Sequence, residues 1–357
     1  MTGEGRCSFL VPGDLHTRTG GYTYDRHIIE GLRARQWTVD VLPLGEGYPA
    51  PDAAALARAA RVVEGLPDEA LAVVDGLAFG VLPELARQHA QRLNWVALVH
   101  HPLALETGLD AARRQALADS ERRALAHARG VIVTSHATAR ALADFEVEAS
   151  RIVVVEPGTE PAPLASGSGG DALSLLCVAT LTPRKGHALL VEALAGLKDR
   201  RWVLHCAGSL TMDAACAGAL ARAIDAHGLR ERVLLHGEQD ETGLRALYAK
   251  ADAFVLPSFH EGYGMALAEA LAHGLPVIST RAGAIPDTVP DTAGMLVTPG
   301  DVVELRAALQ RLMDDAAWRA QLGAGARAAR GRLPSWAQSS ARFASALAGF
   351  GRSAISP

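Results

Sequence analysis

Short apolar runs alternate with segments of helical periodicity along most of the 357-residue chain. In the first half the apolar runs are CSFLV, TVDVL, LAVVD, WVALV, VIVTS and IVVV. Helix-like segments separate them, among them YTYDRHIIEGLRARQ and AARRQALADSERRALAHA. Strands that alternate with helices in this way predict an α/β fold with a parallel sheet covered on both faces.

A stretch rich in Pro, Gly and Ser, PAPLASGSGGD, interrupts this pattern at residues 161–171 and predicts a linker. The alternation resumes with ALSLLCVAT, RWVLHCAG, RVLLHG, DAFVLPS and PVIST. We therefore predict two doubly wound parallel-sheet domains, over residues 1–160 and 172–333, and a final amphipathic helix in 334–357. In such sheets a ligand binds beyond the carboxyl ends of the strands, so we expect a central cleft to hold the site.

Composition agrees with two packed domains and excludes some function classes. Hydrophobic residues make up 49% and charged residues 21%, which is enough apolar surface for sizeable cores. The net charge of −4 and the lack of a basic block argue against nucleic acid as a partner. The N-terminus has no apolar h-region and no run reaches about 18 apolar residues, so we expect a cytoplasmic protein, at most at the inner face of the membrane.

The four cysteines are Cys7, Cys177, Cys206 and Cys216, and no two of them form a CxxC pair. Cys177 and Cys206 lie in apolar runs that read as buried strands. We expect buried free thiols, and neither a zinc site nor a disulfide framework.

Candidate ligand-binding residues are concentrated in the stretch HEGYGMALAEALAHGLP, at residues 260–276. The strand before it ends near Ser258, and a helix begins near Met265. Gly262 and Gly264 then form the turn from strand to helix, where missing side chains let a ligand approach the backbone. The first amides of the helix, at the positive end of its dipole, suit a phosphate group.

Two acids, Glu261 and Glu269, flank this turn eight positions apart. A carboxylate accepts two hydrogen bonds from vicinal hydroxyls, so either acid suits a ribose or a hexose. The turn and the acids together favour a nucleotide diphosphate sugar as ligand. The alternative is an ordinary strand-to-helix turn, with one capping acid and one surface acid.

The stretch resembles the E-x7-E motif of the GT4 family of retaining glycosyltransferases (group 1), whose GT-B fold has two Rossmann-like domains. Other segments resemble the same family: TRTGG at 17–21, VHHP at 99–102, TPRKGH at 182–187, HGLPVISTRAGAIPDTV, and the tail with Trp336, which looks like the crossover helix to the N-terminal domain. The resemblance covers nearly the whole chain. It implies an N-terminal acceptor-side domain and a C-terminal nucleotide-sugar donor domain.

The resemblance also implies roles for the residues around the motif. Glu261 would contact the donor sugar near its 3- and 4-hydroxyls, and Glu269 would hold the ribose. The turn and the first helical amides would meet the distal phosphate; these residues are Gly262, Tyr263, Gly264, Met265 and Ala266.

Arg184 and Lys185 follow the strand LSLLCVA, at the carboxyl edge of the second sheet. A diphosphate leaving group gains negative charge as the glycosidic bond breaks, and fixed cations stabilise that charge most in the transition state. Many family members carry Gly-Arg after this strand, where Ala179 and Thr180 stand here. Arg184 is a candidate to replace the missing arginine, beside Thr180, and an exposed basic turn is the alternative.

His100 and His101 end the strand WVALV, and neighbouring strand residues point in opposite directions. The family pattern favours His100 at the donor sugar's 6-hydroxyl, with His101 nearby; a histidine that caps the loop is the alternative. The pattern also places the loop that holds Gly20 and Gly21 over the donor phosphates and beside the acceptor; a plain strand-to-helix turn is the alternative. Candidates for holding the base are Gly237, Glu238 and Gln239. Two further residues are read as structural, namely Ser135 as a helix N-cap and Gly158 as a backbone-shaping glycine.

We therefore expect a retaining hexosyltransferase that moves a hexose from a UDP- or GDP-linked donor to a hydroxyl of a glycan, a lipid-linked saccharide or a small molecule. The sequence contains no Asp-x-Asp, so we expect neither metal nor cofactor. Two alternatives stay open: a sugar-nucleotide 2-epimerase of the same fold, and a non-catalytic nucleotide-sugar-binding subunit. Four arginines in one helix could contact an anionic membrane, although a solvated face is the simpler interpretation; they are Arg113, Arg114, Arg122 and Arg123.

Overall fold

The computed structural model describes residues 5–351. The chain divides into two compact units. Unit 1 holds the described residues up to Gly158 together with those from Pro334 onward, and unit 2 is Thr159–Leu333. Each unit is described by itself.

Unit 1 is built on a parallel sheet of six strands in the order β2-β1-β3-β4-β5-β6. The strands are β1 (Arg6–Pro12), β2 (Thr38–Gly45), β3 (Leu71–Asp75), β4 (Asn94–Val99), β5 (Gly130–Val133) and β6 (Ile152–Val154). All six correspond to the apolar runs of the first half of the sequence. Because every strand is parallel, their carboxyl ends share one edge of the sheet.

Side chains of successive strand residues pack in two separate cores, one on each face of this sheet. Phe9 packs with α1 (Gly20–Ala34) and α14 (Trp336–Gly351). Leu10, one position later, packs on the opposite face. That face is covered by α2 (Ala53–Glu64), α4 (Pro83–Gln88) and α5 (Ala111–Leu125), while α3 (Gly76–Phe79) and α6 (His136–Ala141) are short helices after β3 and β5. Helices on both faces confirm the predicted α/β layering.

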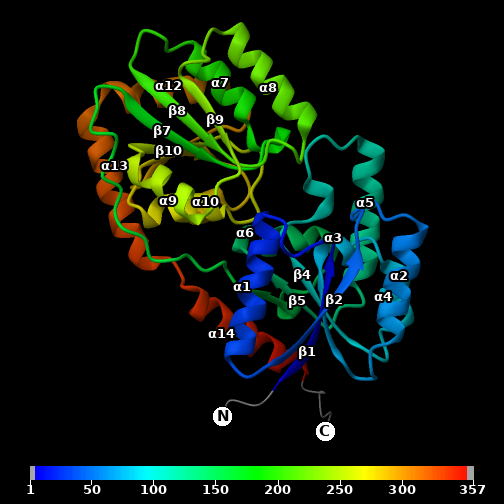
Figure 1. The fold of residues 1–357 in the computed structure, drawn as a ribbon. Helices are drawn as coiled ribbons and strands as arrows, with labels where there is room; N and C mark the ends of the chain where they lie inside the picture. The colour runs from blue at the N-terminus through cyan, green and yellow to red at the C-terminus, as the bar shows by residue number, and fades with distance from the viewer. Residues whose placement is uncertain (1–4, 352–357) are drawn as a thin grey trace. The chain divides into compact units, whose positions relative to one another are not determined.

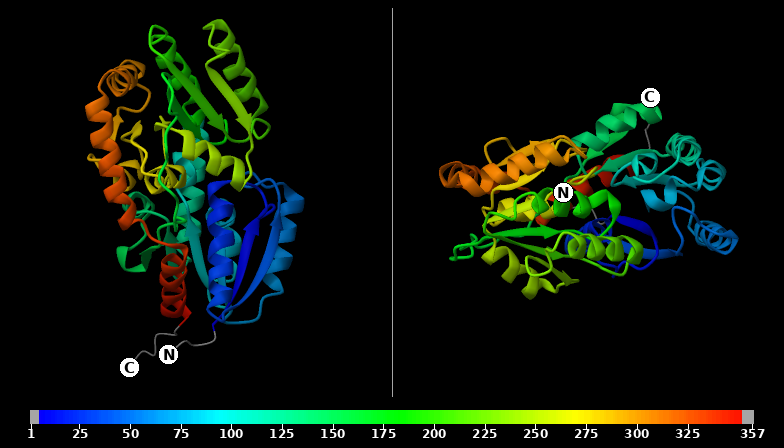
Figure 2. Two further views of the ribbon diagram at one scale, coloured as in Figure 1. Left: turned by 60° about the vertical axis from the view of Figure 1, so that its left-hand side comes forward. Right: turned by 90° about the horizontal axis from the view of Figure 1, so that it is seen from above.

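The C-terminal helix α14 lies alongside α1 in unit 1 (Figures 1 and 2). Trp336 stacks on His27 with ring centroids 4.1 Å apart, and Phe343 lies 6.4 Å from Phe9. The amphipathic tail seen in the sequence is therefore a helix whose apolar face completes the core of unit 1.

Unit 2 has a second parallel sheet of six strands, in the order β12-β11-β10-β7-β8-β9. The strands are β7 (Leu173–Val178), β8 (Trp202–Ala207), β9 (Val233–Gly237), β10 (Ala253–Leu256), β11 (Val277–Thr280) and β12 (Gly294–Val297). Five match the predicted runs; β12 was missed. The helices are α7 (His187–Ala195), α8 (Ala214–Ala226), α9 (Glu241–Lys250), α10 (Met265–Ala272), α11 (Ile285–Thr288), α12 (Val302–Asp314) and α13 (Ala316–Ala329).

The segment 161–171 has no regular secondary structure and runs along unit 2. Ala165 N–H donates to His273 O at 2.8 Å, and Ser166 N–H donates to Ala249 O at 2.9 Å. The four cysteines are free; Cys7, Cys177 and Cys206 are buried, and Cys216 is half-buried.

Candidate active site

Two groups of polar residues stand at the carboxyl edges of the two sheets, one in each unit. In unit 2, Lys185 Nζ donates to both carboxylate oxygens of Glu261, at 2.7 and 2.9 Å. The Arg184 guanidinium lies 3.7 Å from the same carboxylate and donates to His260 O at 2.8 Å. We call Arg184, Lys185 and Glu261 the donor cluster. The structure thus brings together three residues that the sequence placed on two separate strand ends, and none of them is an exposed turn residue.

Glu261 is held at its side chain and at its backbone. Ser258 Oγ donates to Glu261 Oε1 at 2.6 Å. Gly283 has φ +55°, and a Cβ there would lie 2.2 Å from Glu261 O, so only glycine permits this approach. Burial opposes ionisation of Glu261, but Lys185 and Arg184 outweigh it and hold the pKa of its carboxyl below the usual value. Glu261 is therefore a buried, ionised carboxylate.

The helix α10 starts directly after this acid. Gly264, at φ +90°, is its N-cap, and Leu267 N–H donates back to Gly264 O at 2.9 Å. The residues Met265 and Ala266 form the first turn, where helix geometry leaves amides without an intrahelical carbonyl. Tyr263 is buried and Gly262 is half-buried. An anion beside Lys185 would meet the positive end of this helix.

The second acid, Glu269, lies on α10 and is paired with a tyrosine. Tyr248 Oη, from α9, donates to Glu269 Oε2 at 2.9 Å, and its ring stacks on His273 at 4.7 Å. Burial raises the pKa of Glu269, and the Tyr248 hydrogen bond offsets only part of that effect. Tyr248 therefore fixes the orientation of the acid that we expect at the ribose.

The remaining candidates of unit 2 lie farther along the same edge of the sheet. Gly237 ends β9 with φ +69°, and Gln239 Nε2 donates to His236 O at 2.8 Å. Glu238 lies between them. In the strand order, β7 and β8 separate this edge strand from β10. Thr180 follows β7 and accepts a backbone hydrogen bond from Thr182 at 2.9 Å.

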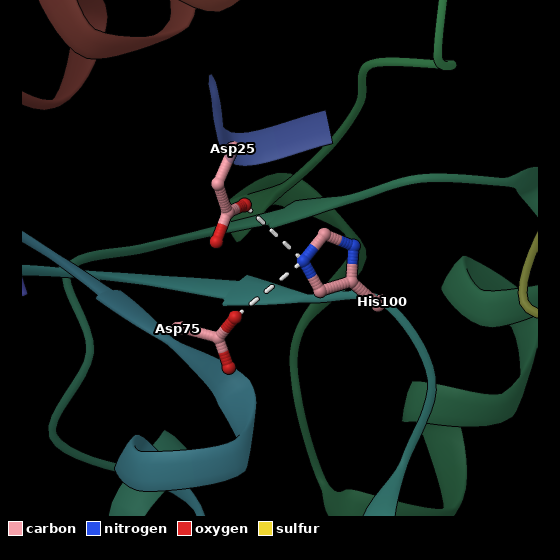
Figure 3. A group of neighbouring side chains, drawn as sticks. All are labelled: Asp25, Asp75 and His100. Carbon is pink, nitrogen blue, oxygen red and sulfur yellow. Dashed lines mark ion pairs between the residues drawn. The ribbon is translucent and has the colours of Figure 1, made fainter. Parts of the chain in front are cut away.

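In unit 1, His100 stands at the end of β4 with its Nε2 turned toward two acids (Figure 3). The nitrogen lies 3.3 Å from Asp25 Oδ1 and 3.6 Å from Asp75 Oδ2. Both carboxylates are buried. We call Asp25, Asp75 and His100 the histidine cluster. The residue after His100 is His101, and its side chain points in another direction, as expected for neighbouring residues at a strand end. His101 Nε2 lies 3.3 Å from Glu106 Oε2.

The predicted glycine pair is also close to His100, although it lies in a helix rather than a loop. Gly20 and Gly21 are the first two residues of α1, and Thr19 caps that helix by accepting from Tyr22 N–H at 3.3 Å. A Cβ on Gly21 would lie 3.4 Å from the imidazole ring of His100. The small residue therefore lets the helix start pass close to the histidine.

Two family models match separate parts of the chain: "Glycosyl transferase 4-like domain" over residues 37–158 and "Glycosyl transferases group 1" over residues 172–315. A relative from Mycolicibacterium hassiacum, "MMP alpha-(1->4)-mannosyltransferase", is 30% identical over 81% of this chain and 73% of its own length. The chain belongs to the group 1 glycosyltransferases. This GT4 glycosyltransferase is therefore a hexosyltransferase that takes its sugar from a nucleotide-sugar donor.

Solved structures show the fold of the glycosyltransferase. A sucrose-phosphate synthase from Thermosynechococcus elongatus is similar with a TM-score of 0.81 at 23% identity, over 95% of this chain and 98% of that one. Anabaena Alr3699/HepE in complex with UDP-glucose is similar with a TM-score of 0.74 at 19% identity, over 96% and 99%. The GT-B fold predicted from the sequence is confirmed. Further relatives named "D-inositol 3-phosphate glycosyltransferase" are matched over about half of their own length.

Sequence reasoning missed four residues that support the site of this glycosyltransferase: Asp25, Asp75, Tyr248 and Ser258. Asp75 could have been predicted from the sequence, because a carboxylate that ends a buried strand lies at the edge of a parallel sheet where ligands bind. Asp25 could also have been predicted, since its spacing puts it on the same helix face as Ile28, Ile29 and Leu32. It is therefore an acid on an apolar face. Ser258 and Tyr248 gave no comparable pattern.

The arginine-rich helix of this glycosyltransferase is α5, and its charges are engaged within the chain. Arg122 pairs with Asp119, and Arg123 pairs with Glu84. Arg113 donates to Pro49 O at 3.3 Å. These contacts favour the solvated-face interpretation of the helix. Among residues 5–351, no helix is both long and apolar enough to cross a membrane.

Proposed function

We propose that this glycosyltransferase is a retaining, metal-independent hexosyltransferase that transfers a hexose from a UDP- or GDP-linked donor to an acceptor hydroxyl. The observation that carries the proposal is the donor cluster. Two cations and a buried, ionised carboxylate meet at the start of a helix, at the carboxyl edge of the sheet of unit 2.

The donor cluster can receive both ends of a sugar diphosphate. The Lys185 ammonium has three donors, and Glu261 occupies part of them. A carboxylate offers about four lone-pair sites, and Ser258 and the two bonds of Lys185 fill three of them, so Glu261 can accept one sugar hydroxyl while it keeps all three bonds. The diphosphate then lies against Lys185, Arg184 and the amides of Met265 and Ala266. Glu269 takes the ribose, and the backbone at Gly237 and Gln239 takes the base.

The cations supply the charge stabilisation that a divalent ion gives in other sugar transferases. As the glycosidic bond breaks, the diphosphate gains negative charge, and Lys185 and Arg184 stabilise it. Chelation with EDTA should leave the transfer rate unchanged. Complete loss of activity that Mn²⁺ restores would contradict a metal-independent reaction.

Retention follows from displacement on one face of the sugar. The diphosphate leaves, an oxocarbenium-like centre develops, and the acceptor hydroxyl attacks from the side of the leaving group. A phosphate oxygen of the donor takes the proton of that hydroxyl. In this proposal His100 contacts the 6-hydroxyl of the same sugar, and Gly20 and Gly21 lie beside the phosphates. The protein contributes alignment and charge stabilisation.

Relatives support a hexose donor. One is named a mannosyltransferase, and a neighbour of the same fold is described in complex with UDP-glucose. The acceptor class stays broad: a glycan, a lipid-linked saccharide or a small molecule. A 2-epimerase would convert the donor without any acceptor, so product analysis with donor alone separates the two reactions.

A panel of UDP- and GDP-hexoses tests the proposal, first by thermal shift and then by transfer to candidate acceptors. The cognate donor at about 100 times its Kd should stabilise the protein by about 2.7 kcal/mol. With that donor, Lys185→Gln and Glu261→Gln should each lower kcat by about 10²–10³-fold. Lys250→Gln removes the same charge from an exposed site on α9 and serves as the matched control. Wild-type rates in both cluster variants would remove the site assignment.

A further inference from the structure

The histidine cluster contains two buried carboxylates that the proposed mechanism leaves unexplained. Asp25 comes from α1 and Asp75 from the end of β3, yet both carboxylates are directed at one nitrogen of His100 (Figure 3). Asp25 is 0% exposed and Asp75 is 1% exposed. A buried carboxylate is costly unless a proton or a cation compensates it.

Asp25 depends on His100 for this compensation. Neither of its carboxylate oxygens accepts a hydrogen bond, and both are shielded from solvent. Asp75 is better supported, because its Oδ1 accepts from Leu77 N–H at 2.7 Å and its Oδ2 faces His100. Among the described residues, the imidazole is thus the group that can carry positive charge to both acids.

The ring of His100 is also held in place from its other sides. Tyr24, from α1, meets it edge-on with ring centroids 5.4 Å apart. The carbonyl oxygen of His100 accepts from Thr134 Oγ1 at 3.2 Å and from Thr138 Oγ1 at 3.3 Å. Position and orientation of the imidazole are therefore fixed before any ligand binds.

We propose that Asp25 and Asp75 are positioning residues, which hold His100 through Nε2 as an imidazolium and so present its Nδ1–H as a fixed hydrogen-bond donor to the sugar donor. Figure 3 shows Nδ1 on the side of the ring that faces away from both carboxylates. An imidazolium donates from both nitrogens, whereas a neutral imidazole donates from one. This inference rests on the proposed function, in which His100 contacts the donor sugar.

The charges around the ring agree with this assignment. Burial lowers the pKa of His100, but the two acids outweigh it and raise the pKa to about 10. Burial raises the pKa of Asp25 to about 7, despite the opposing effect of His100. Two phenols of α1 are also nearby: burial raises the pKa of Tyr22 to about 12 and raises that of Tyr24 well above its ordinary value. Thr134, directly after β5, and Thr138, on α6, carry no charge.

A divalent ion is the competing occupant of the histidine cluster. The three side chains each offer one ligand atom, and these atoms lie within 4.8 Å of one another. An ion would bind the lone pair of Nε2 and so require a ring without a proton there. A proton is the simpler compensation, because His100 itself brings it.

The first experiment follows His100 by NMR in protein labelled with ¹⁵N-histidine, in EDTA and without any sugar nucleotide. His100→Asn assigns its signals by their loss. Between pH 6 and 8.5 the ring should keep the shifts of an imidazolium. In Asp25→Asn and Asp75→Asn, which preserve shape and remove one charge, the pKa of His100 should fall by about 1–3 units. A wild-type ring that titrates near 6.5 would overturn the inference, even if neither variant folds.

Metal ions provide the second arm. Zn²⁺ or Mn²⁺, added to the EDTA-free protein at one equivalent, should leave the His100 signals unchanged. If one equivalent of the ion shifted or removed these signals in the wild type but not in Asp25→Asn, the cluster would bind a metal ion in place of the proton. That result would overturn the inference.

The third experiment measures the pH dependence of kcat, which would not change if the two acids had a purely structural role. In Asp75→Asn, kcat should fall by about tenfold per pH unit above the new pKa of His100, and the wild type should show no such fall below pH 8.5. The same profile in variant and wild type would contradict the positioning role. The NMR experiment does not depend on sugar transfer, so its outcome is independent of the proposed function. A neutral His100 ring in an active transferase would refute this inference and leave the proposed function intact.

Discussion

Glu261 and Glu269 are both poorly accessible carboxylates, yet their surroundings shift their pKa values in opposite directions. Lys185 and Arg184 lie beside Glu261 and lower its pKa in spite of burial. Glu269 has only the neutral hydroxyl of Tyr248, so burial dominates and its pKa rises. The first acid is therefore a permanent anion that balances the cations before the diphosphate arrives. The second acid is better suited to exchange one hydroxyl partner for another.

Another buried acid, Glu121 on α5, yields a test of stability against pH. Its Oε2 accepts from Leu103 N–H at 2.9 Å, and burial raises the pKa of the carboxyl to about 8. The unfolded chain loses this proton near 4.5, whereas the folded chain keeps it to about pH 8. The folded state binds the extra proton in this window, so stability should fall as the pH rises from about 4.5 to 8.

Glu121→Gln should remove that slope, because the amide oxygen can still accept from Leu103 and carries no charge. At pH 5 we expect variant and wild type to unfold at similar urea concentrations. At pH 8.5 the variant should be more stable by about 3–5 kcal/mol. Urea titrations at intervals between these values measure the difference. A constant difference across the range would show that Glu121 ionises normally.

Residue types and spacing were sufficient to predict the donor cluster, but not its supporting residues. Lys185 and Glu261 each follow a buried strand, and parallel strands bring their carboxyl ends to one edge, so their meeting follows from topology. The partnership of Asp25 with His100 depends on the rotation of α1 over the sheet. No local pattern encodes that rotation, because the packing of α1 against α14 and β1 sets it.

At the scale of elements, the apolar runs predicted the strands of both sheets except β12. That strand, Gly294–Val297, begins with a glycine directly after the turn-forming residues PDTA, so its apolar run is only Met295–Val297. Its place at the edge of the sheet comes from pairing with β11. The glycine pair was expected in a loop and instead opens α1, because the Thr19 cap starts the helix at Gly20.

The turn before α10 gives a prediction at this scale. Gly283 has a left-handed backbone, and a Cβ there would lie 2.2 Å from Glu261 O. Gly283→Ala must therefore displace the backbone of Glu261 as well as accept the left-handed strain. We expect a loss of stability above the roughly 1–2 kcal/mol that the strain alone costs, and a weaker affinity for the donor. Urea denaturation and donor titration measure the two effects.

Gly228 provides the matched control for this substitution. It is also left-handed, at φ +64°, and a Cβ there meets nothing within 4 Å. Gly228→Ala should cost only the backbone strain, and donor affinity should stay unchanged. Equal effects of the two substitutions on donor binding would show that the contact between Gly283 and Glu261 does not matter to the site.

At the scale of the whole molecule, each unit on its own supplies only part of the expected donor contacts. The ribose and the base are assigned to unit 2, and so are the charged contacts to the phosphates, through residues such as Lys185 and Glu269. The family pattern assigns the sugar's 6-hydroxyl to His100, which belongs to unit 1. A free nucleoside diphosphate and a complete sugar nucleotide should therefore leave different footprints on the chain.

Hydrogen exchange with mass spectrometry can read these footprints. UDP or GDP alone should slow exchange at amides of 181–187 and 262–268, by up to about 100-fold at 100 times Kd where exchange requires release of the ligand. The cognate sugar nucleotide should add protection at 99–101, because its hexose engages the strand end at His100. A sugar nucleotide of the same base with a non-cognate sugar is the control and should resemble the nucleotide alone. Identical footprints for UDP and the cognate UDP-sugar, or for the GDP pair, would mean that the hexose does not contact unit 1, and His100 would then lose its assigned role while Lys185 and Glu261 kept theirs.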